Sequence, residues 1–556
     1  MCRCPVRRWV ICLWKESVNK SWTGDRENRC FLAWFLWMAV YYGFRLFHLT
    51  PWYDELYTYY YFISRGPVYA AVHWPLPNNH VGYSVLSGFL DLLGSPMVGL
   101  RGMSYIAALA NLALLYRIGR KCFSSGWAFC CVVLYSCMNL INQLAVQGRG
   151  YTLAVTCFLA AVSMIQEIGW KEGEGTKKDI KYYVIFALSL TLGLYILPSS
   201  VYWVIPVCVT GGLFLLFYKK IRPLLYLIAS GAAAAVSTVF LYAVIWLAIG
   251  SNLLSKAEGG SFYGQGHISI IRSAPVLAAR TGMNYMLETP YIQSVGRDGY
   301  FTRMAGWLRS LFNLYYPNGK IFLLASAAIG IVFAAWRARK EYKEGRKERF
   351  FLLLFVEVML VMTPVFLIVQ NALPYFRVFS YMGIPLAVLL CILLRSVGES
   401  GYWQRLMEWC GRKGAMISKN GSLGPYITKI PAAVIVLSAV RLLLSEGYNG
   451  EYGMTEYYAR DALEQADIGG DERLCVTDCY QQYLLKFYYG IECENTAMEE
   501  ADMALLHKEM AVKEDAGFRW EFYHNYETIP WEEINDGMEP VYENEEYIVY
   551  KRKQER

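Results

Sequence analysis

The chain has 556 residues, of which 55% are hydrophobic and only 18% are charged. Soluble domains usually carry about 25% charged residues, so the composition argues against a soluble enzyme. The net charge of +7 does not indicate a nucleic-acid partner, because the basic residues cluster between hydrophobic blocks. The sequence also lacks a GxxxxGK[ST] phosphate loop and an HExxH motif, which disfavours a pump driven by nucleotide hydrolysis.

Long apolar blocks predict membrane-spanning helices, each of which needs about 20 mostly apolar residues. The first block follows a basic head, 1–30, and no small-residue cleavage site follows it, so we expect an uncleaved first span. The sequence predicts an α-helical multi-pass membrane domain, 31–445, with about eleven spans in all. They are expected at 31–47, 101–118, 124–143, 151–167, 183–197, 201–217, 224–249, 319–336, 350–369, 376–394 and 430–445.

Basic loops predict how these spans are oriented. The loops after the second, fourth, sixth, eighth and tenth spans are rich in Lys and Arg, most clearly RARKEYKEGRKER at 337–349. Because cytoplasmic loops carry such an excess, we expect these loops and the N-terminus to be cytoplasmic in a plasma-membrane protein. The first loop, 48–100, the long loop 251–318 and the tail 446–556 are then extracytoplasmic.

Three outer segments have characteristic compositions. The segment 81–94 is short and amphipathic, which predicts a helix lying on the membrane surface. The long loop contains SKAEGGSFYGQGHIS at 255–269, whose Gly and polar residues predict a mobile segment that becomes ordered over a bound ligand. The tail has 27 Asp and Glu against 10 Lys and Arg, and its strand-like runs predict a small α+β domain.

An acidic pair directly follows the first span, in HLTPWYDELYTYYYF at 48–62. The simplest interpretation of Asp54 and Glu55 is a polar loop within a belt of interfacial aromatic residues. The same loop continues with PLPNNHVGYS at 75–84, which adds His80 beside two amides. This combination of acids, amides and a histidine favours a functional cluster at the outer face.

Two arginines fall on the face where the charge rule predicts few cations. Arg149 lies in QLAVQGRGYTLAV, and Arg377 lies in QNALPYFRVFSYMGIP. Each one alone could extend along the helix end to the membrane interface. Together they favour an anion held at the outer face, where a polyprenyl-phosphate carrier would place its phosphate. Arginine suits phosphate because it donates two parallel hydrogen bonds, and a nearby carboxylate can remove a proton from an attacking hydroxyl.

At this point the chain resembles a known family, the GT-C class of membrane glycosyltransferases. The closest branch contains the protein O-mannosyltransferases and aminoarabinose transferases, glycosyltransferase family 39 with its RgtA/B/C/D-like relatives. The resemblance spans about 1–400 and rests on the order of WYDE, the NNH stretch, LRGMSYIAALANLALLYRIGR, GRGYTL and LYILPSSVY. The tail matches nothing in the family, and NHVGY replaces its usual HPP.

The resemblance implies roles for particular residues. It implies that Asp54 is the catalytic base and that Glu55 is the second acid of the catalytic pair. Donor binding is expected from one group of residues, namely His80, Arg101, Arg149, Tyr151, Tyr195 and Arg377. The implied reaction is inverting transfer of a sugar from a polyprenyl-phosphate donor to a hydroxyl of a glycan, lipid or protein, with membrane lipids as surroundings.

Other functions and cofactors stay open at this stage. The acidic pair could bind a divalent cation, although the resemblance favours a site without metal or cofactor. A transporter or flippase for lipid-linked or small polar substrates would need polar groups deep in its spans, and the best candidate is Glu357. A non-catalytic scaffold would use the tail to bind partners. The tail of an enzyme could instead bind the acceptor or brace the outer loops.

Overall fold

Eleven apolar helices form the bundle of the computed structural model, which describes residues 24–74, 78–170, 179–288, 294–398, 430–469, 472–476, 478–492, 498–508 and 531–553. Eight are long and apolar enough to cross a membrane, and three are shorter. All eleven coincide with predicted spans. They are α2 (Arg26–His48), α6 (Pro96–Cys122), α7 (Ser125–Ser136), α9 (Tyr151–Trp170), α10 (Ile180–Ile196), α11 (Val201–Phe217), α12 (Ile221–Lys256), α16 (Lys320–Lys343), α17 (Lys347–Gln370), α18 (Gly383–Gly398) and α21 (Ile430–Leu443).

Two predicted spans are broken at the end of the bundle that carries the acidic loop. The predicted span 124–143 is split, because α7 ends at Ser136 and α8 (Asn139–Leu144) restarts after Met138. The predicted span 376–394 begins as the 3-10 helix η4 (Phe376–Met382) before α18. Hydropathy does not report either break, since the apolar composition continues across it. Both breaks place irregular backbone beside the acidic loop.

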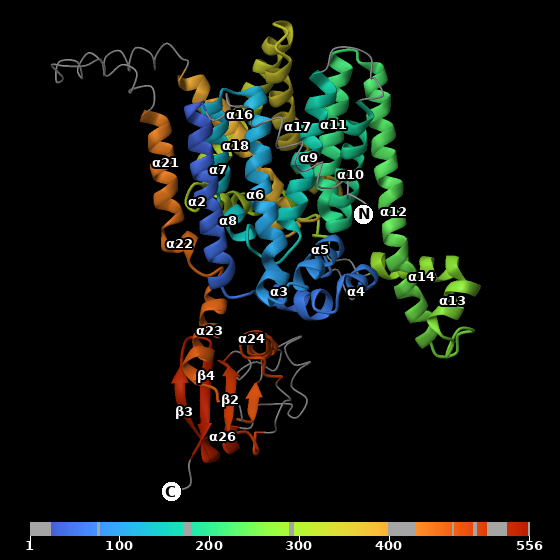
Figure 1. Cartoon of the computed structure of the whole chain (residues 1–556), viewed down its shortest axis with the longest axis vertical. Coiled ribbons are helices and arrows are strands. Elements are labelled where there is room, and N and C mark those ends of the chain that lie inside the picture. Colours follow the sequence, from blue (N-terminus) through green and yellow to red (C-terminus); the bar gives the residue numbers. More distant parts are fainter. Residues whose placement is uncertain are drawn as a thin grey trace, which may run out of the picture.

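The first loop forms a layer of short helices across one end of the bundle (Figure 1). It contains α3 (Tyr53–Thr58), the π-helix η1 (Tyr59–Ile63), α4 (Pro67–Val72) and α5 (Val81–Asp91). The predicted amphipathic helix at 81–94 is therefore present as α5, but one face of it is fully buried, including Tyr83 and Ser84. The acidic pair lies in the first turn of α3.

The long loop 251–318 is largely helical, which corrects the expectation that its composition resists a fixed fold. α12 continues as far as Lys256, and α13 (His267–Ser273), α14 (Pro275–Glu288) and α15 (Tyr300–Tyr315) follow. Gly282 and Gly250 allow α12 and α14 to pack closely, because a Cβ on either one would overlap the backbone of the other helix. A turn at 257–266 retains the glycine-rich stretch, so composition located the turn but missed the helices around it.

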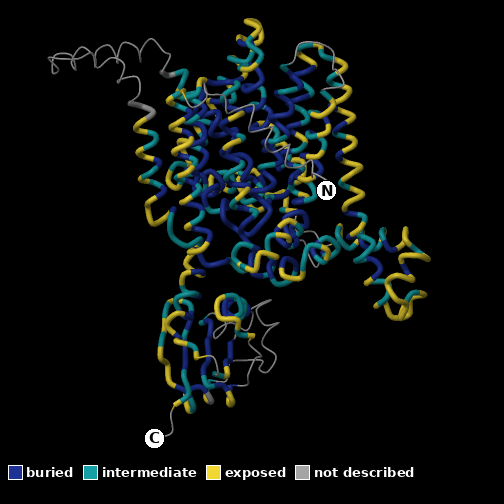
Figure 2. Tube along the Cα trace, in the orientation of Figure 1, coloured by how far each residue is buried: buried dark blue, intermediate teal, exposed yellow. Residues whose placement is uncertain are grey.

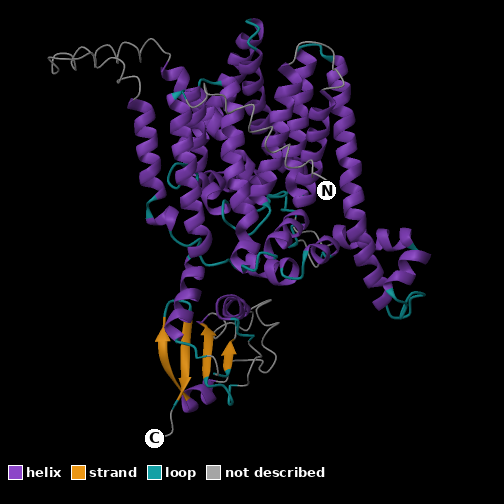
Figure 3. Ribbon diagram, viewed as in Figure 1, coloured by secondary structure: helices purple, strands orange, loops and turns teal. Residues whose placement is uncertain are grey.

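The tail forms the predicted small α+β domain (Figure 3). Its four-stranded sheet has the order β1-β2-β4-β3, from β1 (Leu474–Val476), β2 (Met503–His507), β3 (Met538–Glu543) and β4 (Tyr547–Arg552). The first two strands are parallel and the other pairs are antiparallel. α23 (Met454–Ala466) and α24 (Cys479–Tyr489) share a hydrophobic core with the sheet. β1 and β2 are buried along their whole length, whereas the edge strand β3 is mostly exposed (Figure 2).

This domain lies at the same end of the molecule as the acidic helix (Figure 1). Leu56 of α3 is fully buried and belongs to the hydrophobic core of the tail domain. Tyr480 of α24 donates a hydrogen bond to the carbonyl of Pro51 over 2.8 Å. Thr50 donates from its backbone N–H and from its hydroxyl to the two carboxylate oxygens of Glu451, each over 2.9 Å. The tail therefore braces the acidic loop, one of the two roles that the sequence left open.

Candidate active site

Asp54 is the partly exposed acid of the pair. Its side chain is 20% exposed, and Oδ2 lies 3.0 Å from Nη2 of Arg377. Arg377 comes from η4, so the ion pair joins the first outer loop to the loop before the last helix of the bundle core. Asp54 and Arg377 therefore contact each other directly, although most of the membrane domain lies between them in the sequence.

Three aromatic rings surround the guanidinium of Arg377. Its Cζ lies 4.9 Å from the ring centre of Trp52, 5.0 Å from that of Tyr375 and 5.7 Å from that of Tyr151. A guanidinium over an aromatic face is attracted by the electrons of the ring. These rings hold the cation beside Asp54 while leaving its side chain 12% exposed. An anion that approaches from the outer face can reach it.

Glu55 points the opposite way and is completely buried. Its two carboxylate oxygens accept from Nε and Nη2 of Arg101 over 2.8 and 2.9 Å, from the backbone N–H of Trp52 over 2.9 Å and from the backbone N–H of Gly148 over 2.5 Å. A carboxylate with four donors and no solvent contact cannot accept a proton from an incoming substrate. These four donors hold Glu55 inside the loop, and the catalytic role that the resemblance implies for it stays a prediction.

Arg101 completes this buried brace and does not reach the outer face. Besides Glu55, it donates to the carbonyls of Leu46, Leu49 and Thr50, at distances between 2.7 and 3.1 Å. These carbonyls belong to the end of α2 and the turn that follows it. Of the two roles the sequence left for Arg101, helping to bind phosphate or fixing the first loop, the geometry supports the second.

Arg149 lies behind Asp54 and is 1% exposed. Nη1 donates to the carbonyl of Asp54 over 3.3 Å, to the hydroxyl of Thr58 and to the carbonyl of Asn78 over 3.0 Å. Nη2 lies 3.2 Å from Nε2 of His80, and Nε has no acceptor in the described part of the chain. Arg149 thus ties the acidic helix to the NNH stretch and retains donor capacity.

His80 is neutral and presents a donor toward the same place. Burial lowers its pKa well below 6.5, and the positive charges of Arg149 and Arg377 lower it further. Nδ1 accepts from the backbone N–H of Gly150 over 2.9 Å. The single proton of the neutral ring is therefore assigned to Nε2. Nε2–H then faces Nη2 of Arg149 at 3.2 Å, where neither donor can accept from the other, and an anionic oxygen beside them could accept from both.

The glycines on either side of Arg149 allow these contacts. A Cβ on Gly148 would lie 2.5 Å from Cδ1 of Leu100 and 3.0 Å from Oε1 of Glu55. A Cβ on Gly150 would lie 2.7 Å from Cγ2 of Ile196 and 3.3 Å from Nδ1 of His80. Real Cβ atoms essentially never approach closer than 3.0 Å. The GRG sequence is required because the backbone passes directly against both the acid and the histidine.

The two tyrosines that were expected to bind the donor lie in different surroundings. Tyr151 is buried, packs edge-on against His80 at 5.0 Å and is one of the three aromatic rings that surround the guanidinium of Arg377. Tyr195 packs instead against Tyr242 at 5.9 Å, in a neighbouring cluster under α5, and no contact with the acidic pair is recorded for it. Trp52 and Tyr375 were not predicted as site residues, although each stands two residues from a predicted charge. Aromatic residues are common at membrane interfaces, so the sequence did not indicate that Trp52 and Tyr375 surround Arg377.

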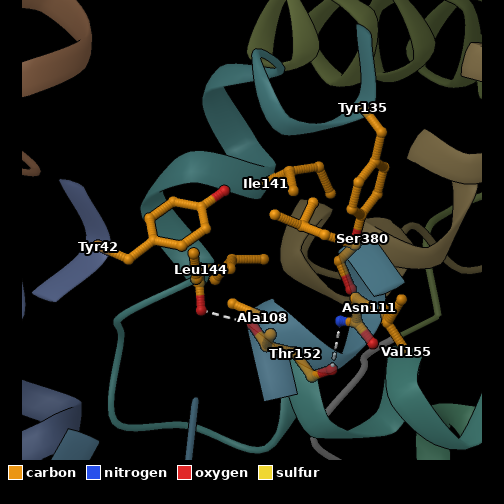
Figure 4. A pocket seen from close by; sticks show the side chains of 11 residues that line it. Tyr42, Ala108, Asn111, Tyr135, Ile141, Leu144, Thr152, Val155 and Ser380 are labelled. Atoms are coloured by element: carbon orange, nitrogen blue, oxygen red, sulfur yellow. Dashed lines mark hydrogen bonds between the residues drawn. The ribbon is translucent and has the colours of Figure 1, made fainter. Parts of the chain in front are cut away.

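Neither an internal cavity nor a metal cluster competes with this site. Figure 4 shows a small cavity among Tyr42, Asn111, Ile141 and Thr152, where Asn111 donates to the Thr152 carbonyl over 3.0 Å. Its lining contains no acid and no base other than tyrosine, so it is a packing defect of the bundle. Within the described ranges, no group of three His, Cys, Asp or Glu is placed to hold a metal ion. Asp54 and Glu55 face different arginines, so they do not converge on a cation.

Comparisons with known proteins indicate what the chain is similar to. Residues 80–248, less than half of the chain, match the PMT_2 family, described as dolichyl-phosphate-mannose-protein mannosyltransferase. The matched segment contains His80, Arg101, Arg149, Tyr151 and Tyr195 of the expected site, while Asp54 and Arg377 lie outside it. No protein with a curated description matches the chain significantly.

Solved structures share its fold. The chain is similar to ArnT from Cupriavidus metallidurans in the apo state, with a TM-score of 0.50 and 13% identity over 93% of this chain and 97% of that one. It is also similar to ArnT from the same organism bound to undecaprenyl phosphate (TM-score 0.47, 13% identity, 94% and 97% covered). A third similarity is to the Archaeoglobus fulgidus oligosaccharyltransferase tethered with an acceptor peptide (TM-score 0.45, 13% identity, 94% and 74% covered). The first of these shows that the chain has an ArnT-like fold.

Proposed function

We propose that the protein transfers a sugar from a polyprenyl-phosphate donor to an acceptor hydroxyl, with inversion at the anomeric carbon and Asp54 as the base. The observation that carries the proposal is the pairing of a partly exposed Asp54 with Arg377, held in an aromatic cage. Asp54 takes the proton of the acceptor hydroxyl as its oxygen attacks the anomeric carbon. The sugar–phosphate bond breaks on the opposite side, and the polyprenyl phosphate leaves with the bonding pair.

The phosphate of the donor would be held by groups that already converge. Nε2–H of His80 and the spare N–H groups of Arg149 offer buried donors, and Arg377 offers a cation that is reachable from outside. Charge-assisted hydrogen bonds from guanidinium to phosphate are short and strong. Because the leaving phosphate gains negative charge as the bond breaks, these donors stabilise the transition state.

Arg377 would change partners during the reaction. In the free protein it neutralises Asp54 at 3.0 Å, which leaves the carboxylate poorly available to an acceptor. A donor phosphate at the same level competes for the guanidinium and releases Asp54. The acid would then become active only when a donor is bound, which limits proton removal from water in the empty enzyme.

The proposed sidedness places this chemistry outside the cytoplasm. The acidic loop and the tail domain lie at one end of the bundle, and the basic turn between α16 and α17 lies at the other (Figure 1). Because basic loops remain cytoplasmic, the site faces the extracytoplasmic side, with the N-terminus inside. The acceptor is a hydroxyl-bearing glycan, lipid or protein reached from that side. Glu357, the residue that would favour a transporter, makes no ion pair within the described residues.

Replacement of Asp54 by Asn tests the proposal. The variant keeps the size of the side chain but cannot take a proton, so sugar transfer should fall to background while folding is retained. Mass spectrometry of cell-envelope glycans and glycolipids compares cells that lack the protein with cells that express wild type or D54N. Asp298→Asn is the matched control, because Asp298 is an exposed acid of the outer loops. A product restored equally by wild type and D54N would exclude Asp54 as the base.

A further inference from the structure

A basic hollow lies at the opposite end of the bundle from the candidate active site. It is formed where α6 and α16 end, where α17 begins and where α18 ends (Figure 1). Including the open solvent at its mouth, it encloses about 420 Å³. Three arginines from three different helices line it, Arg337, Arg349 and Arg395, together with one acid, Glu341.

The acid is already neutralised by other contacts. Glu341 is 1% exposed and accepts from Arg337 over 2.7 Å and from Arg346, which stands outside the lining. Arg349, in contrast, makes no ion pair with any described residue and is only partly exposed. The positive charge of Arg349 is therefore not balanced by Glu341, whose carboxylate is held by Arg337 and Arg346. Concentrating cations in a concave, partly desolvated site is costly unless an anion is bound there.

The walls below the arginines are hydrocarbon. Leu352, Leu353 and Ile392 line the part of the hollow that continues into the bundle, and all three are buried. A free anion would gain nothing from such walls. An amphiphile would place its charged group at the arginines and its apolar portion along the leucines, and basic pockets between membrane helices on the cytoplasmic side bind lipid headgroups in this way.

We propose that this hollow binds the phosphate headgroup of an anionic phospholipid from the cytoplasmic leaflet. The guanidinium groups of Arg349 and Arg395 hold the phosphate, and bound lipid joins the end of α6 to the α16–α17 hairpin and α18. The lipid is a structural ligand that stabilises the bundle and is not consumed. The inference rests on the basic hollow itself and is independent of the reaction assigned to the outer face.

The experiment uses the full chain in nanodiscs of phosphatidylcholine, with or without phosphatidylglycerol. Wild type should unfold at a higher temperature in the anionic discs, and native mass spectrometry should show retained phosphatidylglycerol. The double variant Arg349→Gln/Arg395→Gln should lose the temperature shift and bind the anionic lipid at least about a hundredfold more weakly, since it loses two charge-assisted contacts of about 1.5–3 kcal/mol each. Arg339→Gln is the control, because Arg339 is an exposed arginine of the same helix, α16, outside the hollow.

Three results would overturn the proposal. Equal temperature shifts in wild type and the double variant would assign the lipid effect to another surface. Loss of the shift in R339Q as well would show a general effect of surface charge. A full shift produced by inorganic phosphate in phosphatidylcholine discs would make the ligand a soluble anion instead of a lipid.

If the double variant does not fold, Arg349→Lys keeps the charge without the forked geometry, and wild-type affinity in R349K would contradict specific phosphate binding.

Discussion

The charged residues around α3 divide into a partly exposed pair and a buried pair. Asp54 and Arg377 are partly exposed and paired with one another, whereas Glu55 and Arg101 are fully buried and paired with one another. Two adjacent acids in the sequence thus have different surroundings, because neighbouring residues of a helix project about 100° apart. Composition alone could identify the pair, but burial decides which member can meet a substrate.

Replacement of Arg377 tests its contact with the donor. Arg377→Ala should weaken donor binding and slow transfer by about ten- to a hundredfold, the value of one charged hydrogen bond of about 1.5–3 kcal/mol. Arg377→Lys should recover only part, because a point charge lacks the forked geometry. Binding of a polyprenyl-phosphate sugar to purified protein measures the effect. Arg297→Ala, an exposed arginine of the outer loops, is the control, and unchanged donor affinity in R377A would refute the contact.

Replacement of Arg149 should give a different pattern. Because Arg149 holds the carbonyls of Asp54 and Asn78 as well as offering donors, R149A should lower thermal stability along with donor affinity. Loss of stability alone, with wild-type donor affinity, would restrict Arg149 to a structural role. Comparing the unfolding temperature and the donor affinity of the same preparation separates the two contributions.

The neutral state of His80 predicts a pH dependence of stability. The folded protein keeps His80 unprotonated at pH values where the unfolded chain, with a pKa near 6.5, takes up a proton. Stability from this group is therefore complete above about pH 6.5 and decreases as the pH falls toward the depressed pKa, by at most about 1.4 kcal/mol per pH unit. Denaturant unfolding of wild type and His80→Gln between pH 7 and pH 5 measures the slopes, and identical slopes would contradict a buried neutral histidine.

At the scale of elements, the sequence predicted the helices well and their interruptions poorly. The apolar blocks located all eleven bundle helices because the length of a span is a property of composition. The break between α7 and α8 escaped notice, since Cys137 and Met138 are as apolar as their neighbours. The helices of 251–318 were not predicted, because the prediction for the whole loop was based on the glycines of one turn, 257–266. The contact of Asp54 with Arg377 depends on the broken element η4, so it could be suspected from charge but not placed.

The GRG segment gives the clearest test at this scale. Gly148→Ala should displace Leu100, because its Cβ would lie 2.5 Å from Cδ1 of Leu100 and in tight contact with Oε1 of Glu55 at 3.0 Å, and should destabilise the protein by about 1–3 kcal/mol through overpacking. Sugar transfer should fall along with stability, since Glu55 fixes the start of α3. Gly231→Ala is the matched control, because nothing lies within 4 Å of its Cβ position on α12. Equal unfolding temperatures for both variants would show that the close approach is unimportant.

At the scale of the whole molecule, the acidic helix is held between two bodies. Arg101 binds α3 from the bundle, and the core of the tail domain surrounds Leu56. The segment between α21 and α23, which joins the bundle to the tail domain, is also fixed, because Arg45 and Asn142 donate to the carbonyl of Tyr448. Arg45 and Asn142 stand 403 and 306 residues before Tyr448 in the chain, so no local pattern could have predicted these contacts. The tail domain thus forms one wall of the loop that carries Asp54.

This arrangement predicts that Leu56 couples the tail domain to catalysis. Leu56→Ala removes a fully buried side chain from the shared core and should cost about 2–5 kcal/mol through lost burial and the cavity left behind. Because α3 would then be held from the bundle alone, Asp54 should be positioned less well, and the rate of transfer should fall more than donor affinity. Leu463→Ala is the matched control, since Leu463 is 2% exposed in the same core but belongs to α23. It should weaken the domain without releasing α3, so transfer at a temperature where both variants are folded should fall in L56A and persist in L463A. If both variants keep the wild-type rate, the tail domain has no part in positioning Asp54, and if both lose it equally, its stability alone accounts for the effect.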